Sequence, residues 1–189
     1  MAQQDTNHPP FEQRTTISSV HPLLETERLI QRRFSLEDAP FILELLNDPG
    51  WVQFIGDFGV RTLDDARSYI ETRPLAMYNR VGFGLYLVAL KEGNVPIGMC
   101  GLIKRDTLED VDIGFAFLPT FRGKGYAYEA ASAMLEYGKQ EFALKRIVAI
   151  TTPDNVSSAR LLEKLGLRFE RMIIFPPENE ELKLFAVEF

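Results

Sequence analysis

A glycine turn between a strand pattern and a helix pattern limits the possible folds of this chain more than any other feature. Residues 117–130 read FLPTFRGKGYAYEA, with a glycine on each side of Lys124. Upstream, the apolar runs 83–90 and 97–105 flank the polar KEGNVP and predict a β-hairpin, and residues 110–118 predict a third strand. Downstream, residues 126–142 place apolar side chains at helical spacing. The chain therefore passes from antiparallel strands through this turn into a helix.

Capping signals and apolar patterns place the other elements. Ser35 with Asp38, and Thr62 with Asp65, form capping boxes at the starts of two helices. We expect the second helix to break before Pro74. The patterns predict helices over residues 35–48, 61–80 and 155–167 and strands over residues 25–34, 144–152, 169–175 and 182–189.

Antiparallel strands followed by alternating strands and helices favour an α+β fold, a mixed sheet covered by helices. With 189 residues, 46% of them hydrophobic, the chain is long enough for one sizeable core. We expect a single domain over residues 23–189 and a flexible N-terminal arm over residues 1–22. No apolar run approaches the length of about 18 residues that a membrane span needs. We therefore expect a soluble cytoplasmic protein that contacts no membrane, and leave a homodimer open.

Charge and residue usage argue against several functions. The formal net charge is -6, and lysines and arginines are spread along the chain, so nucleic acid is not an expected partner. His8 and His21 precede the first predicted strand, and the single Cys100 lies in the apolar PIGMCGLI. This pattern provides no metal cluster and little support for Ser-His-Asp or Cys-His catalysis. Amine-bearing partners fit the overall charge better.

The glycine turn has the features of an anion site. Glycines let backbone N–H groups approach a ligand, and a helix N-terminus carries partial positive charge. The sequence lacks the third glycine of a dinucleotide fingerprint, and Gly125 follows Lys124 where a P-loop needs Ser or Thr. A phosphate or pyrophosphate is the expected ligand, and a plain tight connection is the alternative.

The segments DIGFAFLPTFRGKGYAYEA (residues 112–130) and NVSSARLLEKLGLRFE (residues 155–170) together resemble the GNAT superfamily of acyl-CoA-dependent N-acetyltransferases. The opening LETERLIQRRFSLEDAPFILELLND is similar to the branch with ribosomal-protein N-terminal acetyltransferases. The resemblance implies acetyl-CoA as cosubstrate. It also implies that the pyrophosphate of acetyl-CoA binds the residues that match the family pattern, namely Arg122, Gly123, Lys124, Gly125, Tyr126 and Ala127.

The resemblance further implies a GNAT-like acyl-CoA N-acyltransferase fold with a mostly antiparallel, splayed sheet. Residues 111–118 would separate from residues 146–152, and the backbone of Phe117 and Leu118 would bind pantetheine. In the family an amine attacks the thioester directly, and no metal takes part. The acceptor would be a protein N-terminal α-amino group or a small-molecule amine.

Two carboxylates near the expected site have alternative roles. Asp112 lies where the resembling branch often has an acidic residue, so a catalytic or substrate-orienting role is one hypothesis. An alternating strand that presents Asp110 and Asp112 to water is the other. Glu129, in the first turn of the helix after the glycine turn, is expected to favour the helix dipole.

The family's usual acid is a tyrosine seven residues after the asparagine of the second motif. Counting from Asn155 reaches Leu162, so that tyrosine is missing. Ser158 is then the available hydroxyl, and Asn155 can bond pantetheine or a water. The structural alternative is that Asn155 caps the helix and Ser158 is a tolerated first-turn residue. The missing tyrosine also keeps a noncatalytic acyl-CoA-binding domain as an alternative function, with a nucleotide-binding enzyme third.

The acceptor would be selected by segments outside the cofactor site, namely the first two predicted helices, the loop over residues 49–60 that joins them, and the terminal loop. Trp51, Phe54 and Phe58 could wall an apolar acceptor pocket or pack in the core. Three glutamates of the terminal loop could attract a cationic acceptor or remain solvated, namely Glu178, Glu180 and Glu181.

Overall fold

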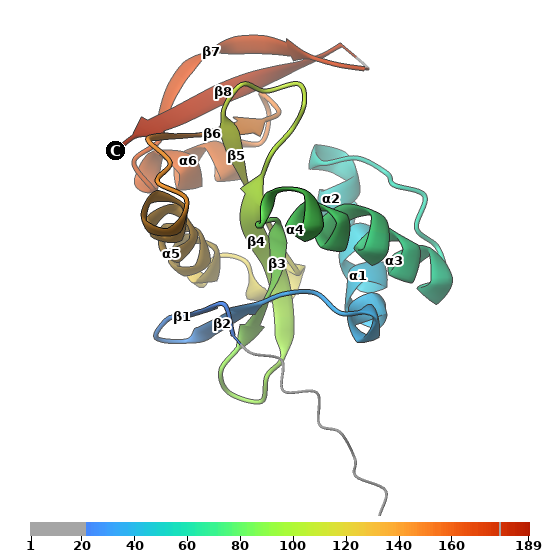
Figure 1. Cartoon of the computed structure of the whole chain (residues 1–189). Helices are drawn as coiled ribbons and strands as arrows, with labels where there is room; N and C mark the ends of the chain where they lie inside the picture. Colours follow the sequence, from blue (N-terminus) through green and yellow to red (C-terminus); the bar gives the residue numbers. More distant parts are fainter. Residues whose placement is uncertain (1–21, 178) are drawn as a thin grey trace, which may run out of the picture.

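An eight-stranded sheet forms the centre of the protein (Figure 1), with the strand order β1-β2-β3-β4-β5-β6-β8-β7. The computed structural model describes residues 22–177 and 179–189, so the expected arm lies almost wholly outside the described residues. The strands are β1 Leu24–Glu25, β2 Leu29–Arg32, β3 Leu85–Leu90, β4 Pro96–Ile103, β5 Val111–Phe117, β6 Arg146–Thr151, β7 Arg168–Phe175 and β8 Glu180–Glu188.

The helices lie in two groups on opposite sides of the central strands (Figure 1). One group follows β2 in the chain, and α5 and α6 form the other. The helices are η1 Leu36–Asp38, α1 Ala39–Leu46, α2 Pro49–Phe54, α3 Leu63–Ile70, η2 Glu71–Leu75, α4 Ala76–Val81, η3 Pro119–Phe121, α5 Tyr126–Glu141 and α6 Val156–Lys164.

Strand alternation divides the core between the two faces. On β3, Tyr86 and Val88 pack in the cluster that contains the α5 residues Ala130 and Met134. Their neighbour Leu87 packs in the other cluster, with α1 and α3. Successive side chains of a strand point to opposite faces, so an apolar strand buried on both sides serves both cores. The expected α+β sheet covered by helices is confirmed.

The strands β5 and β6 are the single parallel pair among the described strands, and they separate after two residue pairs. Val111 pairs with Ile147 and Asp112 with Val148, and no further pairing of these strands follows within the described chain. All other neighbouring strands are antiparallel. The predicted splay of a mostly antiparallel sheet is confirmed, and it begins directly beyond Asp112.

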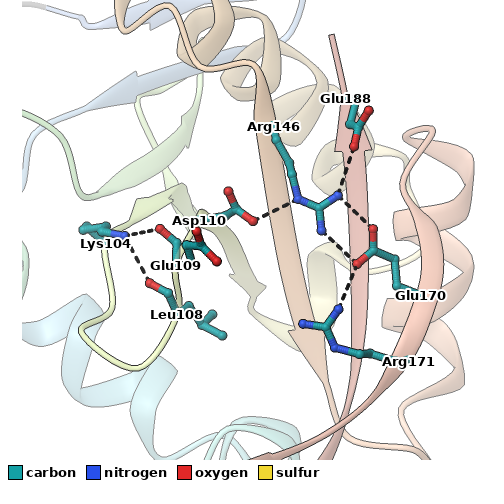
Figure 2. Close-up of polar contacts among 8 residues, drawn as sticks. All are labelled: Lys104, Leu108, Glu109, Asp110, Arg146, Glu170, Arg171 and Glu188. Carbon is teal, nitrogen blue, oxygen red and sulfur yellow. Dashed lines mark hydrogen bonds and ion pairs between the residues drawn. The ribbon is translucent and has the colours of Figure 1, made fainter.

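Arg146 closes the joined end of this splay (Figure 2). Its Nε lies 2.9 Å from Asp110 Oδ2, and both terminal nitrogens lie 2.8 Å from the Glu170 carboxylate. These hydrogen bonds raise the pKa of Arg146, with Glu170 the largest cause, and in turn lower the pKa of Glu170. Lys104 Nζ binds the carbonyl oxygens of Leu108 and Glu109 in the turn before β5. Side chains from β6, β7 and the turn between β4 and β5 therefore hold the base of the opening.

Two predictions about the helices before β3 are wrong. The helix over residues 61–80 does not break before Pro74: α3 continues through the π-helical η2 into α4 and ends at the left-handed Gly82. Wider π-type turns occur as single insertions within α-helices, and here one accommodates a proline that has no N–H. The loop expected over residues 49–60 begins with α2, which Asp48 caps by accepting from Trp51 N–H at 3.0 Å.

Candidate functional site

A cavity of about 980 Å³ opens where β5 and β6 separate. Its walls come from α2, η2, β4, β5, the glycine turn, α6 and β8. Most residues that the sequence proposed for the site meet here. They are Asp112, Phe117, Arg122, Gly123, Gly125, Ala127, Asn155 and Ser158, whereas Leu118, Lys124 and Tyr126 do not line the cavity.

The glycine turn presents unpaired backbone donors. Gly123 and Gly125 have φ of 73° and 83°, in the left-handed region that favours glycine. Gly125 is the N-cap of α5, and its carbonyl accepts the first helical hydrogen bond from Glu129 N–H at 3.0 Å. Within the described chain, none of the N–H groups of residues 123–128 donates to a protein acceptor. Consecutive free donors at the start of a 16-residue helix fit a pyrophosphate.

Arg28, which the sequence did not indicate, adds positive charge to this turn. Its Nη1 donates to Lys124 O at 3.1 Å, and its guanidinium carbon lies 4.5 Å from the centre of the Tyr126 ring. Its Nε and backbone N–H both donate to the Glu129 carboxylate, at 2.7 and 2.8 Å. Burial raises the pKa of Glu129, but hydrogen bonds from Thr26 and Arg28 outweigh burial and leave that pKa below its usual value. Glu129 therefore holds Arg28 beside the turn as well as favouring the helix dipole.

The Arg122 side chain makes contacts within the protein, whereas its neighbours in the turn present free backbone N–H groups. Its Nε donates to Phe117 O at 2.8 Å, and its Nη2 pairs with the buried carboxylate of Asp48. Gly50 lies against the same guanidinium, since a Cβ there would be 2.8 Å from Nη1. The Arg122 side chain thus ties the end of β5 to α2, on the acceptor side of the cavity. The Asp48-Pro49 dipeptide, an N-cap followed by a proline suited to the first helical position, was the sequence signal for this helix.

Phe117 and Leu118, the two residues expected to bind pantetheine through their backbone, differ in whether their backbone N–H group is already hydrogen-bonded. Leu118 N–H donates to Ile97 O at 2.9 Å, and Leu118 O accepts from Phe121 N–H at 3.0 Å. Backbone groups alternate in direction along a strand, so the Phe117 N–H points away from β4 and toward the splay. Of this pair, Phe117 is therefore the candidate for a β-type contact with an extended ligand.

Asp112 is buried at the point where β5 and β6 begin to separate, so the alternative that it simply faces water is excluded. The residue is 1% exposed, and its Oδ2 pairs with Nε of Arg105 from the turn after β4. Burial raises the pKa of Asp112, and Arg105 opposes the rise. The guanidinium is about a third exposed and so partly screened by water, and burial prevails. A carboxylate with a raised pKa in a cavity is a candidate proton acceptor.

Asn155 and Ser158 lie at the start of α6, on the opposite arm of the splay. Asn155 Oδ1 accepts from Ser158 N–H at 3.1 Å and from Ser157 Oγ at 3.0 Å, so Asn155 caps the helix as expected. Both Asn155 and Ser158 line the cavity. Leu162 also lines it but is 1% exposed and packs in the core.

The acceptor end of the cavity is apolar and arginine-rich. Trp51, Phe54 and Phe58 line it, and Trp51 also packs in the α1–α3 core, so both expected roles apply to that residue. Glu180 lines the cavity and Glu181 does not, while Glu178 lies outside the described residues. The remaining charged residues at this end are Arg73, Arg80 and Arg105.

Metal-binding clusters and the single cysteine are the other features to consider in the described chain. No group of His, Cys, Asp and Glu among residues 22–177 and 179–189 could hold a metal ion. Cys100 is fully buried, and burial raises the pKa of its thiol, as expected for a core residue. None of the described helices is long and apolar enough to span a membrane.

Comparisons with known proteins agree with this geometry. The sequence pattern of the acetyltransferase (GNAT) domain matches residues 28–168. The chain is 33% identical over 147 residues to the uncharacterized N-acetyltransferase YnaD of Bacillus subtilis (strain 168), covering 78% of this chain and 83% of that protein.

Solved structures show the same fold. A GNAT-family acetyltransferase from Bacillus anthracis superimposes with a TM-score of 0.72 and 31% identity, over 89% of this chain and 97% of the other. The ribosomal-protein acetyltransferase RimL in complex with coenzyme A gives a TM-score of 0.76 at 16% identity, over 89% and 98% of the two chains. At that identity the likeness to RimL concerns the fold alone.

Proposed function

The chain belongs to the acetyltransferase (GNAT) family and is an acetyl-CoA-dependent N-acetyltransferase, and from this premise we propose an acceptor and a set of residue roles. The acceptor is a primary amine, either the α-amino group of a peptide or the amine of a small molecule. One observation carries the proposal: the buried Asp112 lies where the sheet opens, and it lines the same cavity as Ser158.

The glycine turn holds the cosubstrate. The free N–H groups of residues 123–128 and the partial charge of the α5 N-terminus bind the pyrophosphate, and Arg28 adds a guanidinium at the turn. Phe117 offers its backbone N–H to the pantetheine along β5. Bound in this way, acetyl-CoA supplies an activated thioester to the opening between the strands.

Asp112 acts as the base for the acceptor. A neutral amine is required, and an amine with a pKa of about 10.4 is almost wholly protonated at neutral pH. Burial raises the pKa of Asp112, which makes its carboxylate a stronger proton acceptor than a surface aspartate. Arg105 fixes the orientation of this carboxylate through its Nε.

Ser158 supplies the proton to the departing sulfur. As the new carbon–nitrogen bond forms and the carbon–sulfur bond breaks, the nitrogen loses a proton to Asp112. The Ser158 hydroxyl donates a proton to the thiolate, and the proton held by Asp112 passes through water to the serine, which restores both residues. Ser158 replaces the tyrosine that other members of the family place at the position of the buried Leu162.

The test is the release of free CoA thiol from acetyl-CoA across a panel of small amines and short peptides, with mass spectrometry of the products. We expect turnover with at least one amine and one acetyl group added at nitrogen. Tight binding of acetyl-CoA with no turnover for any amine would contradict the proposal and favour a noncatalytic acyl-CoA-binding domain. Tight ATP or NAD binding without CoA binding would contradict both.

A further inference from the structure

The walls of the cavity as a whole carry more positive than negative charge. Arg73, Arg80, Arg105, Arg122 and Lys164 line the cavity, against the carboxylates of Asp112 and Glu180 among the described residues. The whole chain has the opposite sign, with a formal net charge of -6. A local excess of guanidinium groups in an acidic protein indicates an anionic ligand group.

Two of these cations already have carboxylate partners, since Arg80 pairs with Asp106 at 2.9 Å and Arg122 pairs with Asp48. Lys164 of α6 lies 4.4 Å from the centre of the ring of Tyr128, in the first turn of α5, and so belongs to the cosubstrate end of the cavity. Arg73 and Arg105 are therefore the cations to consider as ligand-binding groups.

Arg73 has no carboxylate within ion-pair distance in the described part of the chain. It lies in the π-helical segment η2, and its guanidinium carbon is 5.1 Å from the centre of the Phe58 ring. Single π-type turns within helices frequently occur at functional sites. The turn that accommodates Pro74 thus places an aromatic-supported guanidinium at the cavity.

Arg105 retains free donors on the same cavity. It uses Nε for Asp112, and no hydrogen bond from its two terminal nitrogens occurs among the described residues. Its guanidinium carbon lies 5.7 Å from the centre of the Phe175 ring. A planar guanidinium can bind one carboxylate along its Nε edge and offer its remaining N–H groups to a second anion.

Tyr69 lies beside Arg73, because its ring centre is 5.8 Å from that of Phe58, the ring that the Arg73 guanidinium covers. It is 9% exposed, lines the cavity, and its hydroxyl has no hydrogen-bond partner in the described chain. Burial raises the pKa of Tyr69 to about 12, and the positive charges of Arg73 and Arg105 both act to lower it. The hydroxyl is a neutral donor at physiological pH.

We propose that Tyr69, Arg73 and Arg105 form a subsite for a carboxylate or phosphate group of the acceptor. The acceptor is then a primary amine with an anionic group close to its nitrogen. Arg105 binds that anion with its terminal nitrogens while its Nε holds Asp112, which brings the amine to the base. This inference rests on the proposed function, because it assigns the acceptor of the same cavity.

The test compares matched acceptors that differ in one charge. The pairs are serine with serinamide, phosphoethanolamine with ethanolamine, and the peptides Ser-Glu-Ala with Ser-Gln-Ala. We expect the anionic member of at least one pair to have a kcat/KM at least about 10-fold higher per neutral amine, as charge-assisted hydrogen bonds allow. The three pairs distinguish a small carboxylate, a phosphate and an acidic peptide. Equal kcat/KM within every pair would overturn the subsite.

Two variants test which residues cause the preference for the anionic acceptor. Arg73→Gln should lower kcat/KM for the anionic member about 10-fold more than for the neutral one, mainly through KM. Tyr69→Phe, which keeps the ring, should reduce the same preference more weakly. The matched control is Arg67→Gln, because Arg67 is exposed, pairs with Asp64 at 2.6 Å and does not line the cavity. An unchanged preference in both Arg73→Gln and Tyr69→Phe would exclude these residues from acceptor binding.

A binding measurement separates this inference from the proposed function. Calorimetry of N-acetylserine and N-acetylserinamide with the CoA-saturated protein needs no turnover. Tighter binding of the charged product supports the subsite even in a protein that releases no CoA from any amine. Equal binding in an enzyme that does turn over would overturn the subsite and leave the proposed function intact.

Discussion

Asp48 and Arg122 form an ion pair between α2 and the glycine turn, 74 positions apart in the chain. The same carboxylate caps α2, and the same guanidinium holds Phe117 O at the end of β5. One pair of side chains therefore connects the wall of the acceptor cavity to the turn that holds the cosubstrate.

Breaking this pair should affect both sides of the cavity. Asp48→Asn keeps a good N-cap but removes the charge, so we expect a loss of about 1 kcal/mol and a Tm lower by about 2 to 4 °C. The KM for acetyl-CoA and for the amine should both rise. Asp64→Asn, at an exposed ion pair with Arg67, is the control and should change stability by less than about 0.5 kcal/mol. A Tm and both KM values equal to those of the native protein would contradict the proposed connection.

A side chain at Gly125 should weaken cosubstrate binding. Gly125→Glu places bulk and negative charge at the free N–H groups, and we expect the Kd for acetyl-CoA, measured by calorimetry, to rise at least about 10-fold. Gly93→Glu is the matched control, because Gly93 also has a positive φ, 74°, and lies in the turn between β3 and β4 away from the cavity. Similar Kd values for the two variants would show that the turn does not bind the pyrophosphate.

Removing the carboxylate of Asp112 should lower turnover with little effect on acetyl-CoA affinity. For Asp112→Asn we expect kcat to fall about 10²- to 10⁴-fold, the range of general base catalysis. In the native enzyme kcat/KM should decline as the pH falls through the raised pKa of Asp112, and the variant should lose this dependence. A native-like kcat in the variant would exclude Asp112 as the base.

The same raised pKa has a consequence for stability. A carboxyl group whose pKa is higher in the folded than in the unfolded protein favours the folded state below the unfolded pKa. That contribution is lost as the pH rises through the folded pKa. Asp112→Asn is therefore expected to fold at neutral pH, so its loss of activity can be assigned to the missing base.

Ser158→Ala should lower kcat more than it lowers affinity for either substrate. Its neighbour provides a matched control, since Ser157 also precedes the second turn of α6 but directs its hydroxyl to Asn155 Oδ1. Single-turnover measurements of thiol release compare the chemical step in the two variants. Equal rates in Ser158→Ala and Ser157→Ala would remove Ser158 from proton transfer.

Glu129→Gln should destabilise the protein in a pH-dependent manner. The folded-state pKa of Glu129 is lowered, so its contribution is present above the unfolded pKa and is lost as the pH falls through the folded value. At neutral pH we expect a loss of about 1 kcal/mol, or about 2 to 4 °C in Tm. Thermal unfolding at decreasing pH should show the native and variant Tm values converging. A constant difference across the acid range would contradict the role of the ionised carboxylate.

Local signals predicted most of the fold because their physical causes lie within a few residues. The capping box of Thr62 and Asp65 forms as expected, with Asp65 N–H donating to Thr62 Oγ1 at 3.1 Å. Gly166 adopts a left-handed φ of 92° after α6, a conformation that is common in a glycine that follows a helix. The prediction of a helix break before Pro74 was wrong, because a proline removes one backbone hydrogen bond but does not determine whether the helix breaks or widens its turn.

By itself, the sequence determined where strands meet helices, that the turn at Gly123 and Gly125 suits an anion, and which hydroxyl and carboxylates could serve catalysis. Only the tertiary structure decided that Asp112 is buried against Arg105, that Arg122 reaches Asp48, and that Arg73 and Tyr69 share the acceptor cavity with them. Turns and caps follow from interactions between near neighbours in the chain. The charge state and partner of a side chain depend on burial and on residues that the folded sheet brings together from distant positions.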